Sequence, residues 1–325
     1  MSKSSNLDYH TNSAAVGDCS LCVILFCHNQ AQYLASHSAT LRKSASNIDQ
    51  VLVIDIASDI PIHDAVKREF SDFPSCSDMR HEKNIGIVAA MNLALAQVRT
   101  NFVHFLAADD KVTAEFYQSF KTLAVNHPHA GVYSCAYDTM NEDGSDLKNF
   151  QVTPPAISAT YLSPRQVRDA IVRNDSWFAG HATILNVNCI RAIGGFDLEL
   201  GAFSDAYVIY CLALQYGVLF DPASLAIKRL HDNQMGNEIF TKSQTQGLLE
   251  TVLRKMRSEA GATVFDPQFV SRFAGRWRFK IDFAKRNNGM SQTRRTLFSE
   301  LMKVYGVLRY RPYDLYNILK NRLLP

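Results

Sequence analysis

Two adjacent aspartates, Asp109 and Asp110, are the residues whose type and spacing point most directly to chemistry. They follow an apolar run, Phe102 to Ala108, whose length and aromatic content are typical of a buried strand. Neighbouring carboxylates repel each other, and Mg²⁺ or Mn²⁺ commonly joins one or two carboxylates to the phosphates of a substrate. A second interpretation is that both are solvated loop residues, one of which caps the helix expected from about Thr113.

The elements that would position these aspartates alternate between strands and helices, which favours βαβ units and a parallel sheet. Strands are predicted at 21–27, 50–55, 102–108 and 182–186, helices at 30–42, 62–70, 84–97, 113–124 and 204–216, and a linker at 71–83. Open α/β sheets bind ligands at the carboxyl ends of their strands. Because right-handed crossovers leave these ends on one edge, we expect Cys27–Asn29 and Asp55 to lie close to Asp109 and Asp110.

The composition is that of an ordinary soluble globular protein, with 47% hydrophobic and 20% charged residues in a chain of 325. No apolar run reaches the roughly 20 residues that span a bilayer, and the polar leader at 1–18 lacks the layout of a secretory signal. We therefore expect a cytoplasmic protein. The seven cysteines are expected to be free thiols, including Cys19 and Cys22, whose redox or zinc spacing lacks a second pair.

The C-terminal part of the chain is basic, because residues 272–325 contain 13 Lys and Arg but 3 Asp and Glu. Residues 236–325 are predicted to be mostly helical. Basic residues interleaved with aromatic ones suit an anionic membrane surface or a lipid-linked acceptor. They also suit a helical cap with solvated charges, or an oligomer surface. Nucleic acid is not expected as a partner, because no nucleic-acid motif accompanies the charge.

Several phrases, in order, make residues 20–235 resemble the family 2 glycosyltransferases, which have the GT-A nucleotide-sugar-binding fold. The first four are similar to the first two strands of that fold, its Asn-x-Gly…Asn helix and its metal-binding DXD region, and the others to its acceptor half. They lie at 23–34, 51–58, 84–92, 105–110, 193–197, 204–205 and 228–231.

This resemblance implies an α/β fold of the GT-A (Rossmann-like) type, with a mixed, mostly parallel sheet flanked by helices and a helical C-terminal extension. The GT-A domain would span 19–235, divided into a nucleotide-sugar-binding part at 19–125 and an acceptor half at 126–235. The implied activity is metal-dependent, inverting transfer from a nucleoside diphosphate sugar, with a UDP-sugar favoured. The acceptor would be a glycan or lipid-linked saccharide in surface polysaccharide or lipopolysaccharide synthesis, at the inner face of the membrane.

The resemblance also implies roles for donor-side residues. Asp109 would hold Mn²⁺ or Mg²⁺ against the donor diphosphate, with Asp110 beside it and His231 completing the metal site. Asp55 would hydrogen-bond the nucleoside. The full set of implied donor-binding residues is Cys27, His28, Asn29, Asp55, Asn84, Gly86 and Asp109.

On the acceptor side, Asp205 takes the place of the family's general base, which accepts the proton of the attacking hydroxyl. The alternative for Asp205 is a carboxylate that favours the N-terminal dipole of its helix. Trp177 and His181 are candidates for contact with the acceptor sugar. The alternative for this pair is a core tryptophan and a hydrogen-bonded histidine.

Five positions depart from the family pattern. Ala107 stands where the first Asp of DXD often lies, Ile56 and Ala57 replace the usual Asp-Gly, Ser204 replaces a Glu, and Met91 replaces a basic residue. Ile56, Ala107 and Ser204 favour, as the alternative function, a non-catalytic nucleotide-sugar-binding or scaffold protein. A sugar nucleotidyltransferase would need a Gly-rich basic loop after the first strand, and a dehydrogenase would need G-x-G-x-x-G there; Cys27–Gln30 provides neither.

Overall fold

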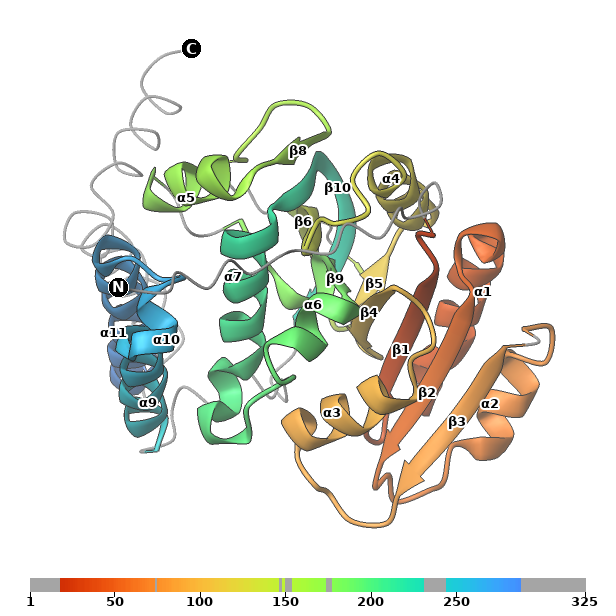
Figure 1. The fold of residues 1–325 in the computed structure, drawn as a ribbon. Helices are drawn as coiled ribbons and strands as arrows, with labels where there is room; N and C mark the ends of the chain where they lie inside the picture. Colours follow the sequence, from red (N-terminus) through yellow and green to blue (C-terminus); the bar gives the residue numbers. More distant parts are fainter. Residues whose placement is uncertain are drawn as a thin grey trace, which may run out of the picture.

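Ten strands of the described chain form one mixed sheet in this computed structural model, with helices on both faces (Figure 1). The structure describes residues 18–73, 75–145, 148–149, 154–173, 177–230 and 244–287. The strands are β1 (Leu21–Cys27), β2 (Gln50–Ile56), β3 (Cys76–His81), β4 (Phe102–Ala107), β5 (Lys111–Val112), β6 (Val132–Asn141), β7 (Lys148–Asn149), β8 (Thr160–Leu162), β9 (Thr183–Asn186) and β10 (Val218–Leu230). Their order along the main path is β3-β2-β1-β4-β9-β6-β10-β5.

The helices divide between the two faces of the sheet. They are α1 (Leu34–Lys43), α2 (His63–Glu69), α3 (Ile87–Gln97), α4 (Ala114–Ala124), α5 (Pro164–Arg173), α6 (Val187–Ala192), α7 (Ser204–Tyr216), α9 (Thr245–Arg257), α10 (Glu259–Ala262) and α11 (Pro267–Asn287), with 3₁₀ turns η1 (Ala31–Tyr33), η2 (Ala45–Asn47), η3 (Gly180–Ala182) and η4 (Leu198–Phe203). Successive side chains of a strand point to opposite faces. Thus Val23 and Leu25 pack in one apolar cluster with α1, α2 and α4, whereas Ile24 and Phe26 pack in another with α3, α5, α6 and α7.

Six strands end at the same edge of the sheet. Strands β1 to β4 are parallel, with Cys27 opposite Asp55 and Phe26 opposite Ala107. Strand β9 runs antiparallel to both β4 and β6, and β6 is parallel to β10. Strands β6 and β10 therefore point the same way as β1 to β4. This edge collects the residues that follow each of the six strands.

The fold class predicted from the sequence is confirmed, because the sheet is mixed and mostly parallel, helices flank it, and further helices follow it. Strand β3 is an exception, since it lies within the segment 71–83 that the sequence predicts as a linker. Its residues, Cys-Ser-Asp-Met-Arg-His, are half-buried for the most part. A strand at the end of the sheet order needs no continuous apolar run, so the pattern that marks β1 is missing.

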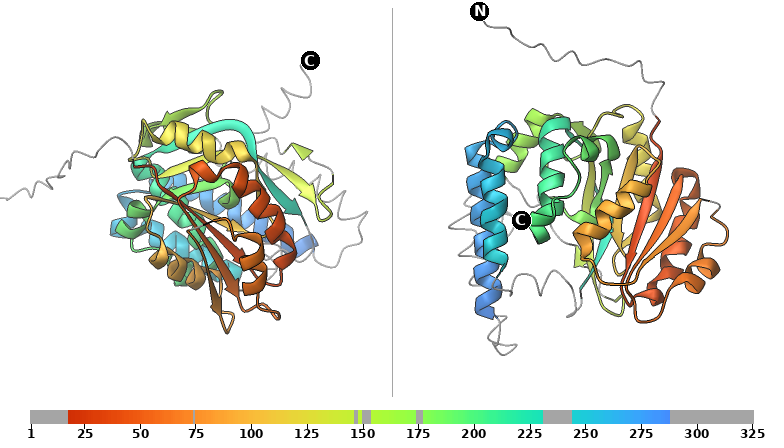
Figure 2. Two further views of the ribbon diagram at one scale, coloured as in Figure 1. Left: turned by 90° about the vertical axis from the view of Figure 1, so that its right-hand side faces the viewer. Right: turned by 60° about the horizontal axis from the view of Figure 1, so that its bottom comes forward.

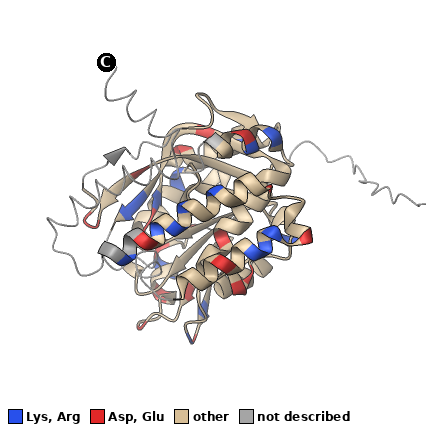
Figure 3. Ribbon diagram, turned by 90° about the vertical axis from the view of Figure 1, so that its left-hand side faces the viewer, with Lys and Arg blue, Asp and Glu red and all other residues tan. Residues whose placement is uncertain are grey.

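The C-terminal helices pack beside α7, on the side away from β1 to β4 (Figures 1 and 2). Tyr210 of α7 packs edge-on against Phe269 of α11, with ring centroids 5.1 Å apart, and its hydroxyl lies 3.1 Å from Nη1 of Arg276. Lys255 of α9 forms an ion pair with Asp197. Lys and Arg are interspersed with Asp and Glu on this side of the molecule (Figure 3). Residues 244–287 therefore share one apolar core with the sheet.

Parts of the predicted termini lie outside the described residues, namely 1–17 of the polar leader and 288–325 of the basic region. Within the described chain, no helix is both long enough and apolar enough to cross a membrane. All seven cysteines are free thiols, as predicted, and Cys19 and Cys22 are both buried.

Candidate active site

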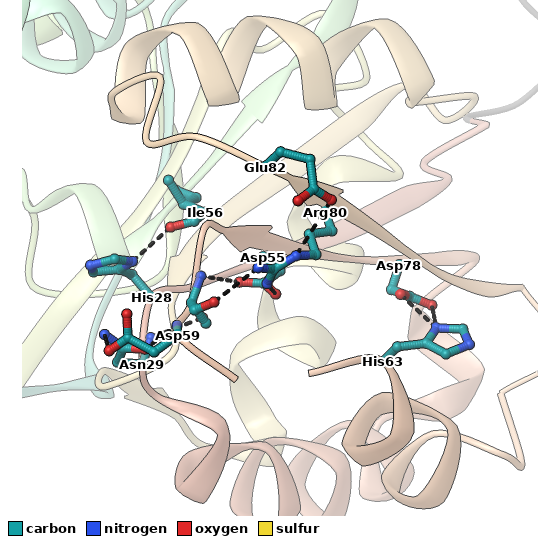
Figure 4. Close-up of polar contacts among 10 residues, drawn as sticks. His28, Asn29, Asp55, Ile56, Asp59, His63, Asp78, Arg80 and Glu82 are labelled. Carbon is teal, nitrogen blue, oxygen red and sulfur yellow. Dashed lines mark hydrogen bonds and ion pairs between the residues drawn. The ribbon is translucent and has the colours of Figure 1, made fainter. Parts of the chain in front are cut away.

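The carboxyl ends of β2 and β3 hold a buried carboxylate and a partly exposed guanidinium (Figure 4). Asp55 is 2% exposed, and its oxygens accept hydrogen bonds from the Ser58 amide at 2.9 Å and from Nη1 of Arg80 at 2.5 Å. Although burial alone would raise it, these hydrogen bonds hold the pKa of Asp55 below its ordinary value. Asp55 is therefore a charged anchor that fixes Arg80, whose side chain is 27% exposed.

The loop after β1 is tied to the loop after β2 (Figure 4). Asn29 and Asp59 exchange hydrogen bonds of 2.8 and 3.1 Å. Nδ1 of His28 lies 2.6 Å from the Ile56 carbonyl, which can only accept, so this nitrogen carries the proton. Asn29 and Ala57 have φ values of 56° and 53°, which L-residues adopt at a cost of about 1–2 kcal/mol. The hydrogen bonds between the loops maintain this strained pair and present His28 and Asn29 to solvent.

Cys27 lies beneath these loops and does not line the site. Its side chain is fully buried among residues of the α1 and α4 face. Burial, with smaller contributions from Asp55 and Asp109, raises the pKa of its thiol to about 12. The sequence-based prediction that Cys27 binds the donor is corrected, because its side chain is enclosed between the sheet and the helices on the α1 and α4 face.

Asn84 and Gly86 are exposed where α3 begins. Oδ1 of Asn84 accepts the Gly86 amide at 3.0 Å, and Gly86 has a φ of 78°, which favours glycine. An added Cβ at Gly86 would meet no atom within 4 Å, so the space beside this residue is open. Further along α3, the Asn92 amide exchanges hydrogen bonds of 2.7 and 2.9 Å with the Phe196 backbone. The helix is thereby fixed to the segment between α6 and η4.

Asp109 and Asp110 lie in the turn between β4 and β5 and differ from each other. Asp109 is half-buried, whereas Asp110 is 9% exposed and accepts the backbone amide of Arg229 at 3.1 Å. Nε2 of His37 donates to the Ala108 carbonyl at 2.8 Å. The interpretation of both aspartates as solvated loop residues is therefore wrong for Asp110. Asp109 is the more accessible carboxylate of the pair.

A divalent cation fits this turn if other groups complete its coordination. Within the described ranges, no three His, Cys, Asp or Glu side chains lie close enough together to hold a metal ion. Asp109 and Asp110 would provide one or two hard carboxylate oxygens, and diphosphate oxygens and water would provide the rest. Mg²⁺ is commonly bound in this way. His231, the predicted third protein ligand, lies outside the described residues.

Asp205 lies in the first turn of α7, beside η3. It is exposed, its Oδ1 accepts the Ala206 amide at 2.7 Å, and a Cβ on Gly180 would lie 3.5 Å from its Oδ2. The surrounding protein atoms displace enough water to raise the pKa of Asp205, and its backbone hydrogen bonds and Lys228 oppose this effect. An accessible carboxylate with a raised pKa is suited to accept a proton from a substrate hydroxyl.

The two predicted acceptor residues are both buried. Trp177 is 1% exposed and packs in the apolar core, with its ring centroid 4.0 Å from that of Phe178. The predicted sugar contact of Trp177 is corrected, because a ring enclosed by the core offers no face to a ligand. His181 is 9% exposed and packs edge-on against Tyr137 at 4.9 Å. Its place next to Gly180 keeps it near Asp205.

Two buried histidines, His104 and His181, make the fold sensitive to acid. Nε2 of His104 donates to the His181 carbonyl at 3.0 Å, and its Nδ1 accepts from the Tyr117 hydroxyl at 3.1 Å, as a neutral ring does. Burial is the main cause that lowers the pKa of His104 to about 4 and that of His181 to about 3. The unfolded chain binds these protons near pH 6.5. Stability is therefore complete above about pH 6.5 and falls as the pH drops towards 4.

We expect the free energy of unfolding to fall in that window by up to about 1.4 kcal/mol per pH unit for each histidine. A His104→Gln variant removes one titrating group, so its slope should be shallower than that of the native protein by about this amount. Urea denaturation between about pH 5 and 7 measures both slopes. Identical slopes in the two proteins would contradict the assignment.

The mixed, helix-flanked sheet is that of the GT-A glycosyltransferases, and its strand ends gather Asp55, the turn with Asp109 and Asp110, and Asp205. Residues 22–183 match the family described as glycosyl transferase family 2, and the chain belongs to that family. It is a glycosyltransferase. No curated protein has a significant match to the sequence.

Two solved structures illustrate the shared fold. The mannosyltransferase PcManGT from Pyrobaculum calidifontis, in complex with GDP-Man and Mn²⁺, has a TM-score of 0.56 and 16% identity, covering 94% of this chain and 84% of that one. S. aureus TarS 1–349, in complex with UDP-GlcNAc, has a TM-score of 0.63 and 13% identity, covering 85% and 77% of the two chains.

Two arginines of the site, Arg80 and Arg229, are missing from the sequence-based predictions. Arg80 lies in β3, whose existence the sequence does not indicate. Arg229 lies within 228–231, a phrase that resembles the acceptor half of the family, so the sequence could have indicated this residue. Its contacts with the Asp109 turn are seen only in the folded chain.

Proposed function

We propose that this glycosyltransferase is metal-dependent and inverting, and that it uses a nucleoside diphosphate sugar, with a UDP-sugar favoured. The acceptor would be a glycan or lipid-linked saccharide in surface polysaccharide or lipopolysaccharide synthesis. The observation that carries the proposal is the meeting of Asp55 with Arg80, Asp109 and Asp205 around the carboxyl ends of the parallel strands. The binding of GDP-Man with Mn²⁺ by PcManGT and of UDP-GlcNAc by TarS supports the donor class.

The pair of Asp55 and Arg80 supports a base that presents an N–H next to a carbonyl. A carboxylate only accepts hydrogen bonds, and a guanidinium only donates them. Uracil offers the matching N–H and C=O groups, as do thymine and guanine, whereas cytosine has an acceptor nitrogen beside an amine. Asp55 would accept the N–H of the base through the small part of its surface that is exposed, 2%, and Arg80, which Asp55 holds in place, would donate to the neighbouring carbonyl.

The acceptor-side chemistry assigns one proton transfer to Asp205. Its carboxylate would accept the proton of the acceptor hydroxyl as that oxygen attacks the anomeric carbon. The new carbon–oxygen bond forms while the bond to the diphosphate oxygen breaks, so a single in-line displacement inverts the anomeric configuration. Mn²⁺ or Mg²⁺ at Asp109 would neutralise the charge on the departing diphosphate.

The described part of the basic region supports contact with an anionic or lipid-linked acceptor. On α11 the Trp277 ring lies 5.4 Å from the Arg276 guanidinium and 4.6 Å from the Lys280 ammonium group. The mixed charges beside them (Figure 3) are also compatible with an oligomer surface. Peripheral association with the inner face of a membrane would use 272–325, of which 288–325 lie outside the described residues.

A thermal-shift screen of UDP, GDP, dTDP and CDP, each with Mn²⁺ or with EDTA, tests the donor proposal. Ligand at 100 times its Kd stabilises the native state by about 2.7 kcal/mol, so UDP with Mn²⁺ is expected to raise the melting temperature. CDP is the matched control, because it differs from UDP only at the base and should give the smallest shift. No shift with any nucleoside diphosphate and Mn²⁺ would refute the proposal.

The non-catalytic alternative is favoured by three departures from the family pattern, Ile56, Ala107 and Ser204. A turnover assay separates it from the enzyme, since a binding protein would give the same thermal shifts without releasing UDP from a UDP-sugar in the presence of glycan acceptors.

A further inference from the structure

Arg229 is a buried arginine at the C-terminal end of β10. It is 3% exposed, although an isolated charge without hydrogen-bond partners is costly inside a protein. In the strand, side chains alternate between faces, so Lys228, which lies near Asp205, and Arg229 point in different directions. Arg229 faces the turn that contains Asp109, whose carbonyl it contacts.

The contacts of Arg229 join three segments that are far apart in the sequence. Its Nε donates to the Asp109 carbonyl at 3.0 Å. Its Nη1 donates to the carbonyls of Asn141 and Glu142, at 3.3 and 2.5 Å, where β6 ends. Its guanidinium carbon lies 4.8 Å from the centroid of the Tyr33 ring, which follows β1. The planar fork of an arginine satisfies several carbonyls at once and in a fixed geometry, which the flexible, point-like ammonium of a lysine does not provide.

The same residue also holds the neighbouring aspartate. The Arg229 backbone amide donates to Oδ1 of Asp110 at 3.1 Å. From the other side of the turn, Nε2 of His37 donates to the Ala108 carbonyl. Three consecutive residues, Ala108 to Asp110, are thus fixed by hydrogen bonds from α1 and β10. Because the backbone is fixed on both sides of Asp109, the direction in which its carboxylate leaves the turn is fixed as well.

We infer that Arg229 is a positioning residue, which orients the Asp109 carboxylate for the divalent cation without contacting that cation. The inference rests on the proposed function, because it concerns the metal that the proposal assigns to this turn. Groups that orient a metal ligand typically change metal affinity or activity by about 10- to 100-fold when they are replaced. A residue that only stabilised the fold would leave the affinity of the folded protein unchanged.

The test compares Arg229→Gln and Arg229→Lys with Arg191→Gln as the matched control. Arg191 also ties backbone carbonyls together, through Nη2 to Leu95 at 3.3 Å and Val98 at 2.9 Å, but it does so just before β4 begins. Mn²⁺ binding to each full-length protein in the presence of UDP is measured by electron paramagnetic resonance, and folding is checked by circular dichroism at the same temperature.

We expect Mn²⁺ affinity to fall about tenfold or more in Arg229→Gln, and to remain lowered in Arg229→Lys, which is also the milder change for folding. Arg191→Gln should lower the melting temperature and keep the native affinity. Native affinity in folded Arg229→Gln overturns the inference, as does full recovery in Arg229→Lys, because lysine keeps the charge but not the fork. Absence of Mn²⁺ binding by the native protein would instead overturn the proposed metal dependence, and this inference with it.

Discussion

Replacing Asp109 with alanine is expected to weaken Mn²⁺-dependent binding of UDP by about 100-fold or more. The turn offers at most two carboxylates, and Asp110 already accepts an amide of Arg229, so Asp109 provides the accessible charge. A divalent cation supplies several kcal/mol of stabilisation to phosphoryl oxygens, and about 2.8 kcal/mol corresponds to 100-fold in affinity. Titration of UDP with Mn²⁺ and with EDTA measures the loss directly.

Two further aspartates make this experiment specific. Asp49→Asn is the control outside the site, because Asp49 accepts the Leu21 amide at 2.8 Å and the Lys121 ammonium at 3.1 Å where β1 begins. It should lower stability and leave metal-dependent binding intact. Asp110→Asn should lower stability and weaken binding less than Asp109→Ala. Undiminished Mn²⁺-dependent affinity in Asp109→Ala would remove the metal from this turn.

The fold follows from the sequence where burial and periodicity coincide. The strands β1, β2 and β4 are short apolar runs, and each is followed by a helix, so their parallel pairing could be predicted. The meeting of Asp55 with the Asp109 turn follows from the same topology, because parallel strands end on one edge. The direction of the strands alone brings these positions together, whatever side chains they carry.

The remaining features depend on contacts that no local pattern records. Arg80 lies in an edge strand without an apolar run, and the partners of Arg229 are carbonyls, which every residue type possesses. Trp177 is predicted as a site residue and is not one, because the same type of ring can stack on a sugar or fill a core, and the sequence does not distinguish the two. The burial of Cys27 could have been predicted from the sequence, since it ends a continuous apolar run and alternation places it on the same covered face as Val23 and Leu25.

Replacing Asp205 with asparagine is expected to lower kcat by about 10²- to 10⁴-fold, the usual contribution of a general base. Donor affinity should stay within about twofold of the native value, because Asp205 acts on the acceptor hydroxyl. Gly180→Ala is a matched steric control: its Cβ would lie 3.5 Å from Oδ2 of Asp205, an ordinary contact distance, so this variant should retain most of its activity.

The Asp205→Asn variant also decides between the two interpretations of Asp205, a general base or a carboxylate that favours the dipole of its helix. The pKa of its carboxyl is raised above the ordinary 3.8, mainly by lost hydration, so the folded state gains nothing from the charge and Asp205→Asn should keep or increase thermal stability. A carboxylate retained only for the helix dipole would give the opposite result, with stability lowered by about 0.3–1 kcal/mol and turnover preserved. As a base, Asp205 must be deprotonated, so kcat/KM of the native enzyme should fall as the pH drops through this raised pKa. That acid limb should be missing from the residual activity of Asp205→Asn, and its persistence would assign the titration to another group.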